Sequence, residues 1–129
     1  SKEVIIKEKI RQTDLTEYEI RQITKIPSYL MTHRYDLPNL KELTQIFKIG
    51  EEKLRKGFKL IYEDTIYSYH RNTILKRGAD LLLRSNLSVD EIAMDLGYSS
   101  ASNFVVAFKN KYHITPLKYR EASLLYEVS

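Results

Sequence analysis

Two groups of clustered cations are the residues of this 129-residue sequence best placed to do chemistry: Lys53, Arg55, Lys56 and Lys59, then Lys109 and Lys111. Lysine and arginine side chains neutralise phosphates and release the counterions that surround a nucleic acid. The formal net charge is +4, so the chain is mildly basic overall. The clusters favour a nucleic-acid partner, and a solvated helix face is the alternative interpretation of the same residues.

Residue types that support catalysis or metal binding do not form a recognisable pattern. The sequence has no cysteine, which excludes disulfides, thiolate zinc sites and cysteine nucleophiles. His33, His70 and His113 are widely separated, without metal-ligand spacing. Glu91 and Asp95 could form a carboxylate pair on one helix, but a helix cap already accounts for Glu91. With no phosphate-binding glycine loop or nucleophile elbow, we expect no catalytic residue, metal or cofactor, and therefore no enzyme.

The ends and the apolar segments indicate where the chain works. No apolar run approaches the roughly 18–20 residues needed to span a bilayer, and no secretory signal is visible. We therefore expect a cytoplasmic protein without a membrane partner. The sequence begins at Ser1 without an initiator methionine, so we expect a fragment of something longer.

The elements that position the cations are expected to be helices. Glycine totals four and proline three, and there is no Asn-Gly or Asp-Gly hairpin turn. Three capping boxes predict helix starts at Asp14-x-x-Glu17, Asn39-x-x-Glu42 and Ser88-x-x-Glu91. The first predicted helix runs to about Lys25 and is broken by Pro27, and residues 33–38 form a connector. The stretch 4–11 fits either a strand or a helix.

The same arrangement occurs twice: a capping box, a short helix, a turn with glycine and a second helix. In the first copy Gly50 is in the turn, and the predicted apolar anchors are Leu43, Ile46, Leu54 and Phe58. In the second copy Gly97 supplies the turn, Ala93 is the small residue where the helices cross, and Phe104 and Phe108 are the anchors. Two sets of side chains are then left outside: Glu51, Glu52, Arg55, Lys56 and Lys59 in the first copy, and Ser99, Ser100, Ser102, Asn103, Val106 and Lys109 in the second.

This repeat predicts an all-α fold with two helix-turn-helix lobes joined by a long central helix. A helix-turn-helix places its second helix in the major groove. A linking helix of about 20 residues would span ~30 Å, close to the ~34 Å of one turn of B-DNA. We predict the following segments: a DNA-binding domain over 39–122, with the first helix-turn-helix at 39–62, the linking helix at 64–84, the second helix-turn-helix at 88–112 and a C-terminal helix at 115–126.

From about Asn39 to Arg120 the sequence resembles the DNA-binding domain of the AraC/XylS family of bacterial transcription regulators. The resemblance is strongest over 87–109, where Ile92-Ala93, Gly97-Tyr98 and Phe104-x-x-x-Phe108-Lys109 stand in the order of the family signature. It continues through Ile114-Thr115-Pro116 to Tyr119-Arg120. The first copy resembles the family through Leu40, Leu43, Leu54, Phe58-Lys59 and Tyr69.

The resemblance implies two three-helix lobes whose second helices contact bases. The implied base-contacting residues are Glu52, Arg55 and Lys56 in the first copy and Ser102, Asn103 and Val106 in the second. The residues expected to contact the DNA backbone are Lys53, Lys59, Ser99, Ser100, Lys109 and Lys111. Four positions depart from the family pattern: Glu63 and His113 where glycine is common, Gly78 where alanine is usual, and Val106 where a basic residue is common.

The implied partner is double-stranded DNA at a promoter or operator, with RNA polymerase as a further candidate partner. Residues 1–38 are expected to be a helical linker or tail from a missing sensor domain, through which the full protein would form a homodimer. Their charge is near balance, so we expect no phosphate contacts from them. The alternative function is a helical protein-interaction module that has lost specific DNA binding, which Val105-Val106 and Glu51-Glu52 favour.

Overall fold

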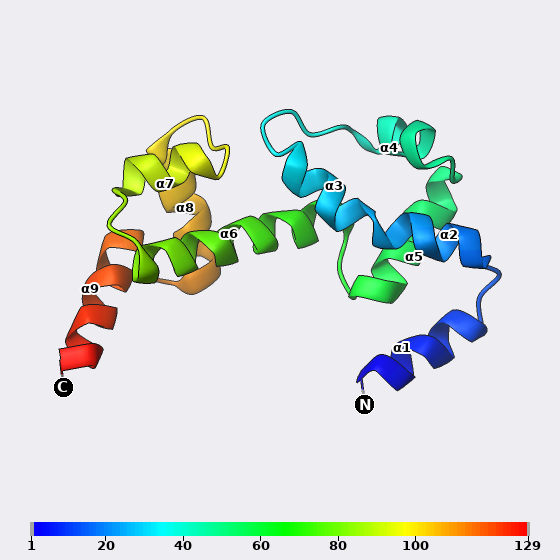
Figure 1. Ribbon diagram of the computed structural model, residues 1–129, viewed down its shortest axis with the longest axis horizontal. Helices are drawn as coiled ribbons and strands as arrows, with labels where there is room; N and C mark the ends of the chain where they lie inside the picture. Colours follow the sequence, from blue (N-terminus) through cyan, green and yellow to red (C-terminus); the bar gives the residue numbers. More distant parts are fainter. Residues whose placement is uncertain (1, 129) are drawn as a thin grey trace. The chain divides into compact units, whose positions relative to one another are not determined.

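The computed structural model describes residues 2–128, and these residues form α-helices joined by short connections, with no strand among them (Figure 1). The chain divides into two compact units, Ser1–His70 and Arg71–Ser129. The boundary falls inside the long helix α6 (Ile66–Arg84). This architecture agrees with the all-α fold expected from the sequence.

The first unit contains five whole helices: α1 (Lys2–Arg11), α2 (Glu17–Thr24), α3 (Ile26–Thr32), α4 (Leu40–Phe47) and α5 (Glu51–Tyr62). The predicted capping box at Asn39 is present, since its side chain accepts from the Glu42 amide at 2.8 Å. The box predicted at Asp14 is wrong, because Thr16 caps α2 and pairs reciprocally with Glu19. Leu15 precedes this cap and packs against the core of the unit, so α2 begins two residues later, at Glu17.

The core of the first unit joins residues from α2 to α6. Its buried members are Ile23, Ile26, Leu30, Leu43, Phe47, Ile49, Leu54, Phe58 and Ile66. Ile46, predicted as an anchor, is instead 41% exposed, whereas the next residue, Phe47, is 6% exposed. Phe47 lies four residues after the buried Leu43 and therefore shares its helix face. The helices α2 and α3 thus belong to the same core as the first helix-turn-helix.

The second unit consists of the C-terminal part of α6 with three further helices: α7 (Val89–Asp95), α8 (Ala101–Tyr112) and α9 (Pro116–Val128). Ser88 and Glu91 form the predicted capping box, and Gly97 turns the chain with a φ of 89°. Ala93, Phe104 and Phe108 are fully or almost fully buried, as predicted. The helix-turn-helix of this unit is therefore α7 and α8.

Gly78 allows α6 to approach α8 closely within the second unit. A Cβ atom at this position would lie 3.0 Å from Leu96 Cδ1 and 3.1 Å from Phe104 Cε1. Phe104 is fully buried, so its ring has little room to move. Close packing therefore accounts for a glycine in the middle of a helix, where it lowers helix propensity by about 1 kcal/mol.

Candidate nucleic-acid interface

The helices α5 and α8 have the same length and the same pattern of buried residues. They begin at Glu51 and Ala101, each has 12 residues, and corresponding positions differ by 50. The buried anchors correspond, since Leu54 and Phe58 in α5 match Phe104 and Phe108 in α8. Each helix therefore presents the opposite face to solvent.

Both helices also end in the same way. Glu63 follows α5 with a φ of 60°, and His113 follows α8 with a φ of 64°. This left-handed conformation explains why glycine is favoured at these positions, since other residues adopt it rarely. The two departures from the family pattern therefore leave the helix ends unchanged.

The exposed face of α5 carries four of the residues predicted to contact DNA: Glu52, Arg55, Lys56 and Lys59. Lys56 Nζ lies 2.9 Å from Glu52 Oε1, one helical turn away. The hydrogen bond from Lys56 holds the pKa of the Glu52 carboxyl below its usual value. In the free protein Lys56 therefore has an acidic partner, which a base or phosphate must replace.

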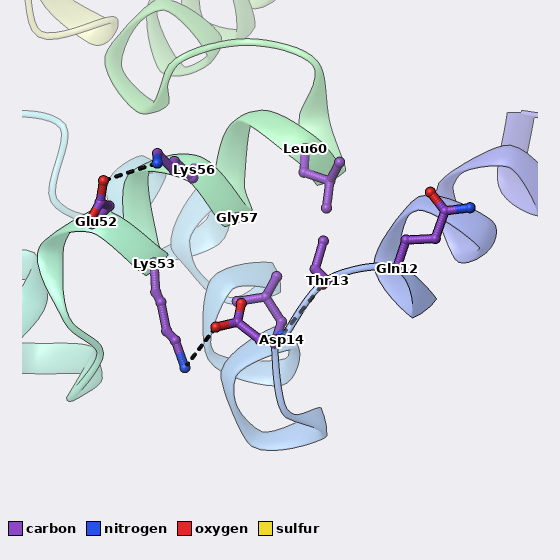
Figure 2. Close-up of a pocket in the computed structure, with 9 residues that line it drawn as sticks. Gln12, Thr13, Asp14, Glu52, Lys53, Lys56, Gly57 and Leu60 are labelled. Atoms are coloured by element: carbon purple, nitrogen blue, oxygen red, sulfur yellow. Dashed lines mark hydrogen bonds and ion pairs between the residues drawn. The ribbon is translucent and has the colours of Figure 1, made fainter.

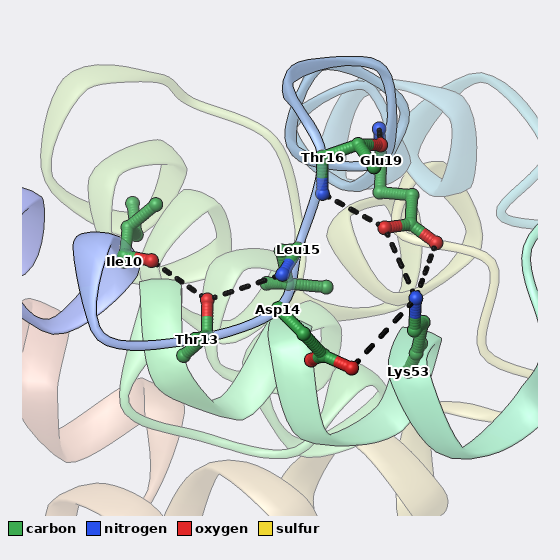
Figure 3. Close-up of polar contacts among 7 residues, drawn as sticks. All are labelled: Ile10, Thr13, Asp14, Leu15, Thr16, Glu19 and Lys53. Carbon is green, nitrogen blue, oxygen red and sulfur yellow. Dashed lines mark hydrogen bonds and ion pairs between the residues drawn. The ribbon is translucent and has the colours of Figure 1, made fainter.

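Lys53 forms ion pairs with two carboxylates of the first unit (Figure 3). Its ammonium lies 3.3 Å from Glu19 Oε2 and 3.9 Å from Asp14 Oδ2. Glu19 also accepts the Thr16 amide hydrogen at 2.8 Å, and this bond, with a smaller contribution from Lys53, lowers the pKa of Glu19. Only 15% of the Glu19 side chain is exposed. Lys53 thus ties α2 to α5, and a phosphate contact by Lys53 would have to compete with this arrangement.

A hollow of about 550 Å³ lies along the flank of α5 that bears Lys53 (Figure 2). One side of it is formed by residues 12–15, and the other side by Glu52, Lys53, Lys56, Gly57 and Leu60 of α5. A Cβ atom at Gly57 would lie 2.6 Å from Ile23 Cδ1 and 3.2 Å from Leu15 Cδ1. The absence of a side chain at Gly57 therefore lets α2 and the preceding turn approach α5.

The exposed face of α8 is polar and carries less charge. Six of the predicted residues are exposed there or at the turn before the helix: Ser99, Ser100, Ser102, Asn103, Val106 and Lys109. Ser100 Oγ caps α8 by accepting the Asn103 amide hydrogen at 3.2 Å. The Asn103 side chain donates to Ser99 Oγ at 2.8 Å, so its amide is already oriented by the turn.

Val106 and Lys111 of α8 differ from these polar, exposed residues in their surroundings. Val106 is 60% exposed and corresponds to Lys56 of α5, so the cation of the first unit is replaced by an apolar side chain. Lys111 is half-buried and donates to Asn72 Oδ1 at 3.3 Å. It therefore contributes to the packing of α8 on α6 within the second unit.

The sequence patterns missed the part that the N-terminal segment plays at this surface. Glu19, Asp14 and residues 12–15 flank α5, although no local pattern relates them to Lys53. Gly57 is the one signal in the sequence, because a glycine in a helix interior indicates close approach of another element. Among residues 2–128 there is no group of three metal-binding side chains, and no helix is long and apolar enough to cross a membrane.

Comparison with known proteins places residues 43–122 in a family described as a helix-turn-helix domain. The xylose operon regulatory protein of Escherichia coli (strain K12) is 26% identical over 113 residues, which are 88% of this chain and 29% of that protein. The chain therefore spans less than a third of this relative. This relative is named as a regulatory protein, and a relative from Neisseria gonorrhoeae is named as a helix-turn-helix transcriptional regulator, which agrees with the expectation that the chain is not an enzyme.

Solved structures share the fold. The DNA-binding domain of AdpA, determined in complex with a target DNA, has a TM-score of 0.68 at 18% identity, over 78% of this chain and 90% of that one. A transcriptional regulator from Chromobacterium violaceum, described as having an AraC-type DNA-binding domain, has a TM-score of 0.68 at 20% identity, over 80% of this chain and 92% of its own. The all-α architecture of the two units is therefore one already known in DNA-binding domains.

Proposed function

This chain belongs to the AraC/XylS family of helix-turn-helix transcription regulators, and we propose that its helices α5 and α8 enter successive major-groove segments of one DNA duplex. The observation that carries this proposal is the correspondence between α5 and α8. Each has 12 residues, two buried anchors four residues apart and an exposed polar face. A helix of this kind reads base edges with its early exposed residues.

We assign base contacts to one set of exposed residues on each helix: Glu52, Arg55 and Lys56 on α5, and Ser102, Asn103 and Val106 on α8. Arginine and lysine suit guanine, asparagine suits adenine, and glutamate accepts from cytosine. Val106 can contact a thymine methyl group. The first unit therefore has the stronger capacity for charge-assisted base recognition.

We assign backbone contacts to residues at the edges of the two faces: Lys53, Lys59, Ser99, Ser100, Lys109 and Lys111. Lys59 and Lys109 are exposed and occupy corresponding positions on α5 and α8, which supports equivalent contacts in the two units. Lys53 and Lys111 have partners in the free protein, so each must break its contact with that partner before it can bind a phosphate.

The whole regulator is proposed to act on promoter or operator DNA in the bacterial cytoplasm. RNA polymerase is a proposed partner at the promoter, and a domain preceding this chain is proposed to dimerise the protein and to sense a signal. Residues 1–38 would then lie between that domain and the first helix-turn-helix, with α2 and α3 packed in the core of the first unit.

The second candidate function is a protein-interaction module on the same fold. Met94 and Val106 favour it, since these apolar side chains are 73% and 60% exposed in the second helix-turn-helix. Salt dependence separates the two functions, because binding to DNA phosphates weakens steeply as salt rises.

The experiment that tests the proposal selects duplexes from a random DNA library with the 129-residue chain. An enriched site with two elements about 10 base pairs apart supports two reading helices. Arg55→Ala should then lower discrimination at one element by about 1–3 kcal/mol and leave the other element unchanged. Binding without an enriched sequence, or unchanged base preference in Arg55→Ala, would contradict the assignment.

A further inference from the structure

A second, more open hollow of about 310 Å³ lies beside the exposed face of α5, lined by Lys9, Lys56, Lys59, Leu60 and Glu63. We call it the Lys9 hollow. Lys9 comes from α1, whereas the other four residues belong to α5 or follow it directly. Three of the five side chains are cations, so the hollow gathers positive charge from two helices.

Each of the two acidic groups near the Lys9 hollow is paired with a lysine other than Lys9 and Lys59. Glu63 Oε2 lies 3.7 Å from Lys2 Nζ, and Glu52 is paired with Lys56 at 2.9 Å. In the part of the chain that the structure describes, Lys9 and Lys59 have no carboxylate within 4.0 Å. Neighbouring cations without a counter-charge repel each other, and a bound anion would relieve that repulsion.

The turn that follows α1 is ordered by local contacts and by packing on α5. Thr13 Oγ1 donates to the Ile10 carbonyl at 2.7 Å and accepts the Leu15 amide hydrogen at 3.4 Å (Figure 3). Leu15 then packs at Gly57, which has no side chain to keep it away. These contacts bring the C-terminal end of α1, and with it Lys9, to the flank of α5.

We propose that Lys9 and Lys59, with Lys56 at the edge nearest the bases, form a binding site for a phosphate group of the DNA strand that borders the groove entered by α5. A helix in the major groove has a phosphate backbone on either side, and cations on its flanks position it there. Lysine ammonium groups form charge-assisted hydrogen bonds with phosphate oxygens. The helix α1 is then part of the DNA-binding surface, although the near-balanced charge of residues 1–38 predicts no phosphate contact.

This inference rests on the proposed function, and its test compares Lys9→Ala with Lys7→Ala in the 129-residue chain. Both substitutions remove one exposed cation from α1, and Lys7 lies outside the residues that line the hollow. Affinity is measured by fluorescence anisotropy, for the selected duplex and for an unrelated duplex of equal length, over a series of salt concentrations. Circular dichroism checks that each variant keeps its helix content.

Losing one phosphate contact should flatten the slope of log K against log salt by about 0.9, which is about an eightfold loss of affinity at roughly 0.1 M salt. We expect this loss for Lys9→Ala on both duplexes, a much smaller loss for Lys7→Ala, and near-normal binding for Lys9→Arg. Equal effects of Lys9→Ala and Lys7→Ala would overturn the inference. Tighter binding by Lys9→Ala would also overturn it, since α1 would then shield the surface.

The two proposals fail in different ways. If the unaltered chain prefers the selected duplex and Lys9→Ala matches Lys7→Ala, only the phosphate site at α1 is wrong. If the unaltered chain shows neither sequence preference nor a salt-dependent affinity for DNA, the proposed function and the phosphate site are both wrong.

Discussion

A Glu19→Gln variant would release Lys53 without removing the cap of α2. Glutamine has nearly the same size and can still accept the Thr16 amide hydrogen that Glu19 accepts at 2.8 Å. It loses the negative charge that lies 3.3 Å from the Lys53 ammonium. Because Lys53 is one of the proposed backbone contacts, we expect Glu19→Gln to bind DNA more tightly than the unaltered chain does.

The size of this gain follows from one additional phosphate contact. One such contact steepens the slope of log K against log salt by about 0.9, which is up to about eightfold in affinity at roughly 0.1 M salt. Asp14 stays 3.9 Å from Lys53, but 85% of its side chain is exposed, so water screens it and it retains Lys53 weakly. We therefore expect an increase of about two- to eightfold, on selected and unrelated duplexes alike.

Glu17→Gln is the matched control, because it removes the same charge from the same helix. Glu17 lies 3.9 Å from Arg21 and is 93% exposed, so its loss does not release Lys53. Anisotropy titrations at several salt concentrations compare the two variants, and a Glu19→Gln, Lys53→Ala double variant should lose the gain. Equal gains from the two glutamine variants would refute the reasoning, since net charge alone would then account for the effect.

Three other predictions concern the second unit and the stability of the fold. Burial lowers the pKa of His70 below its usual 6.5, so the unfolded chain binds more protons than the folded chain does below about pH 6.5. The free energy of unfolding, measured with urea, should therefore decrease as the pH is lowered through this range. The decrease should be smaller in His70→Phe, which has no imidazole to protonate. Gly78→Ala should lower that free energy by up to about 2 kcal/mol at neutral pH, because overpacking against Phe104 costs about 1–3 kcal/mol and the gain in helix propensity is about 1 kcal/mol; an increase would contradict the close packing. Val106→Lys should strengthen DNA binding and steepen its salt slope by about 0.9, and an unchanged slope would count against a groove-facing α8.

Local patterns were sufficient to predict the elements that form by themselves. The capping boxes at Asn39 and Ser88, and the turns before α5 and α8, depend on residues three or four positions apart. Near the N-terminus, Asp14-x-x-Glu17 and Thr16-x-x-Glu19 both fit a capping box. The packing of Leu15 at Gly57 favours the second, and this contact joins residues too distant in sequence for a local pattern to predict it.

The sequence predicts which residues of the candidate site are exposed, but it does not predict which of its charged residues form ion pairs. Helical periodicity identifies Arg55 and Lys59 as exposed residues of α5, and the structure agrees. The same periodicity cannot predict that Lys53 meets Glu19, 34 positions earlier in the chain. Which of two adjacent apolar residues faces the core is also set by packing, as Ile46 and Phe47 show.

The helices α5 and α8 differ in charge, so the two units should contribute differently to the salt dependence of DNA binding. Lys53 and Lys56 of α5 correspond to Asn103 and Val106 of α8, so the same positions are cationic in one helix and uncharged in the other. Salt-dependent affinity should therefore come mainly from the first unit, where Glu19 and Glu52 hold part of the positive charge in the free protein. The second unit should contribute a smaller part of the salt slope, through Lys109 and Lys111, because the neutral side chains of Asn103 and Val106 displace few counterions. A variant that loses the contact of the first unit with DNA should therefore flatten the salt slope more than a variant that loses the contact of the second unit.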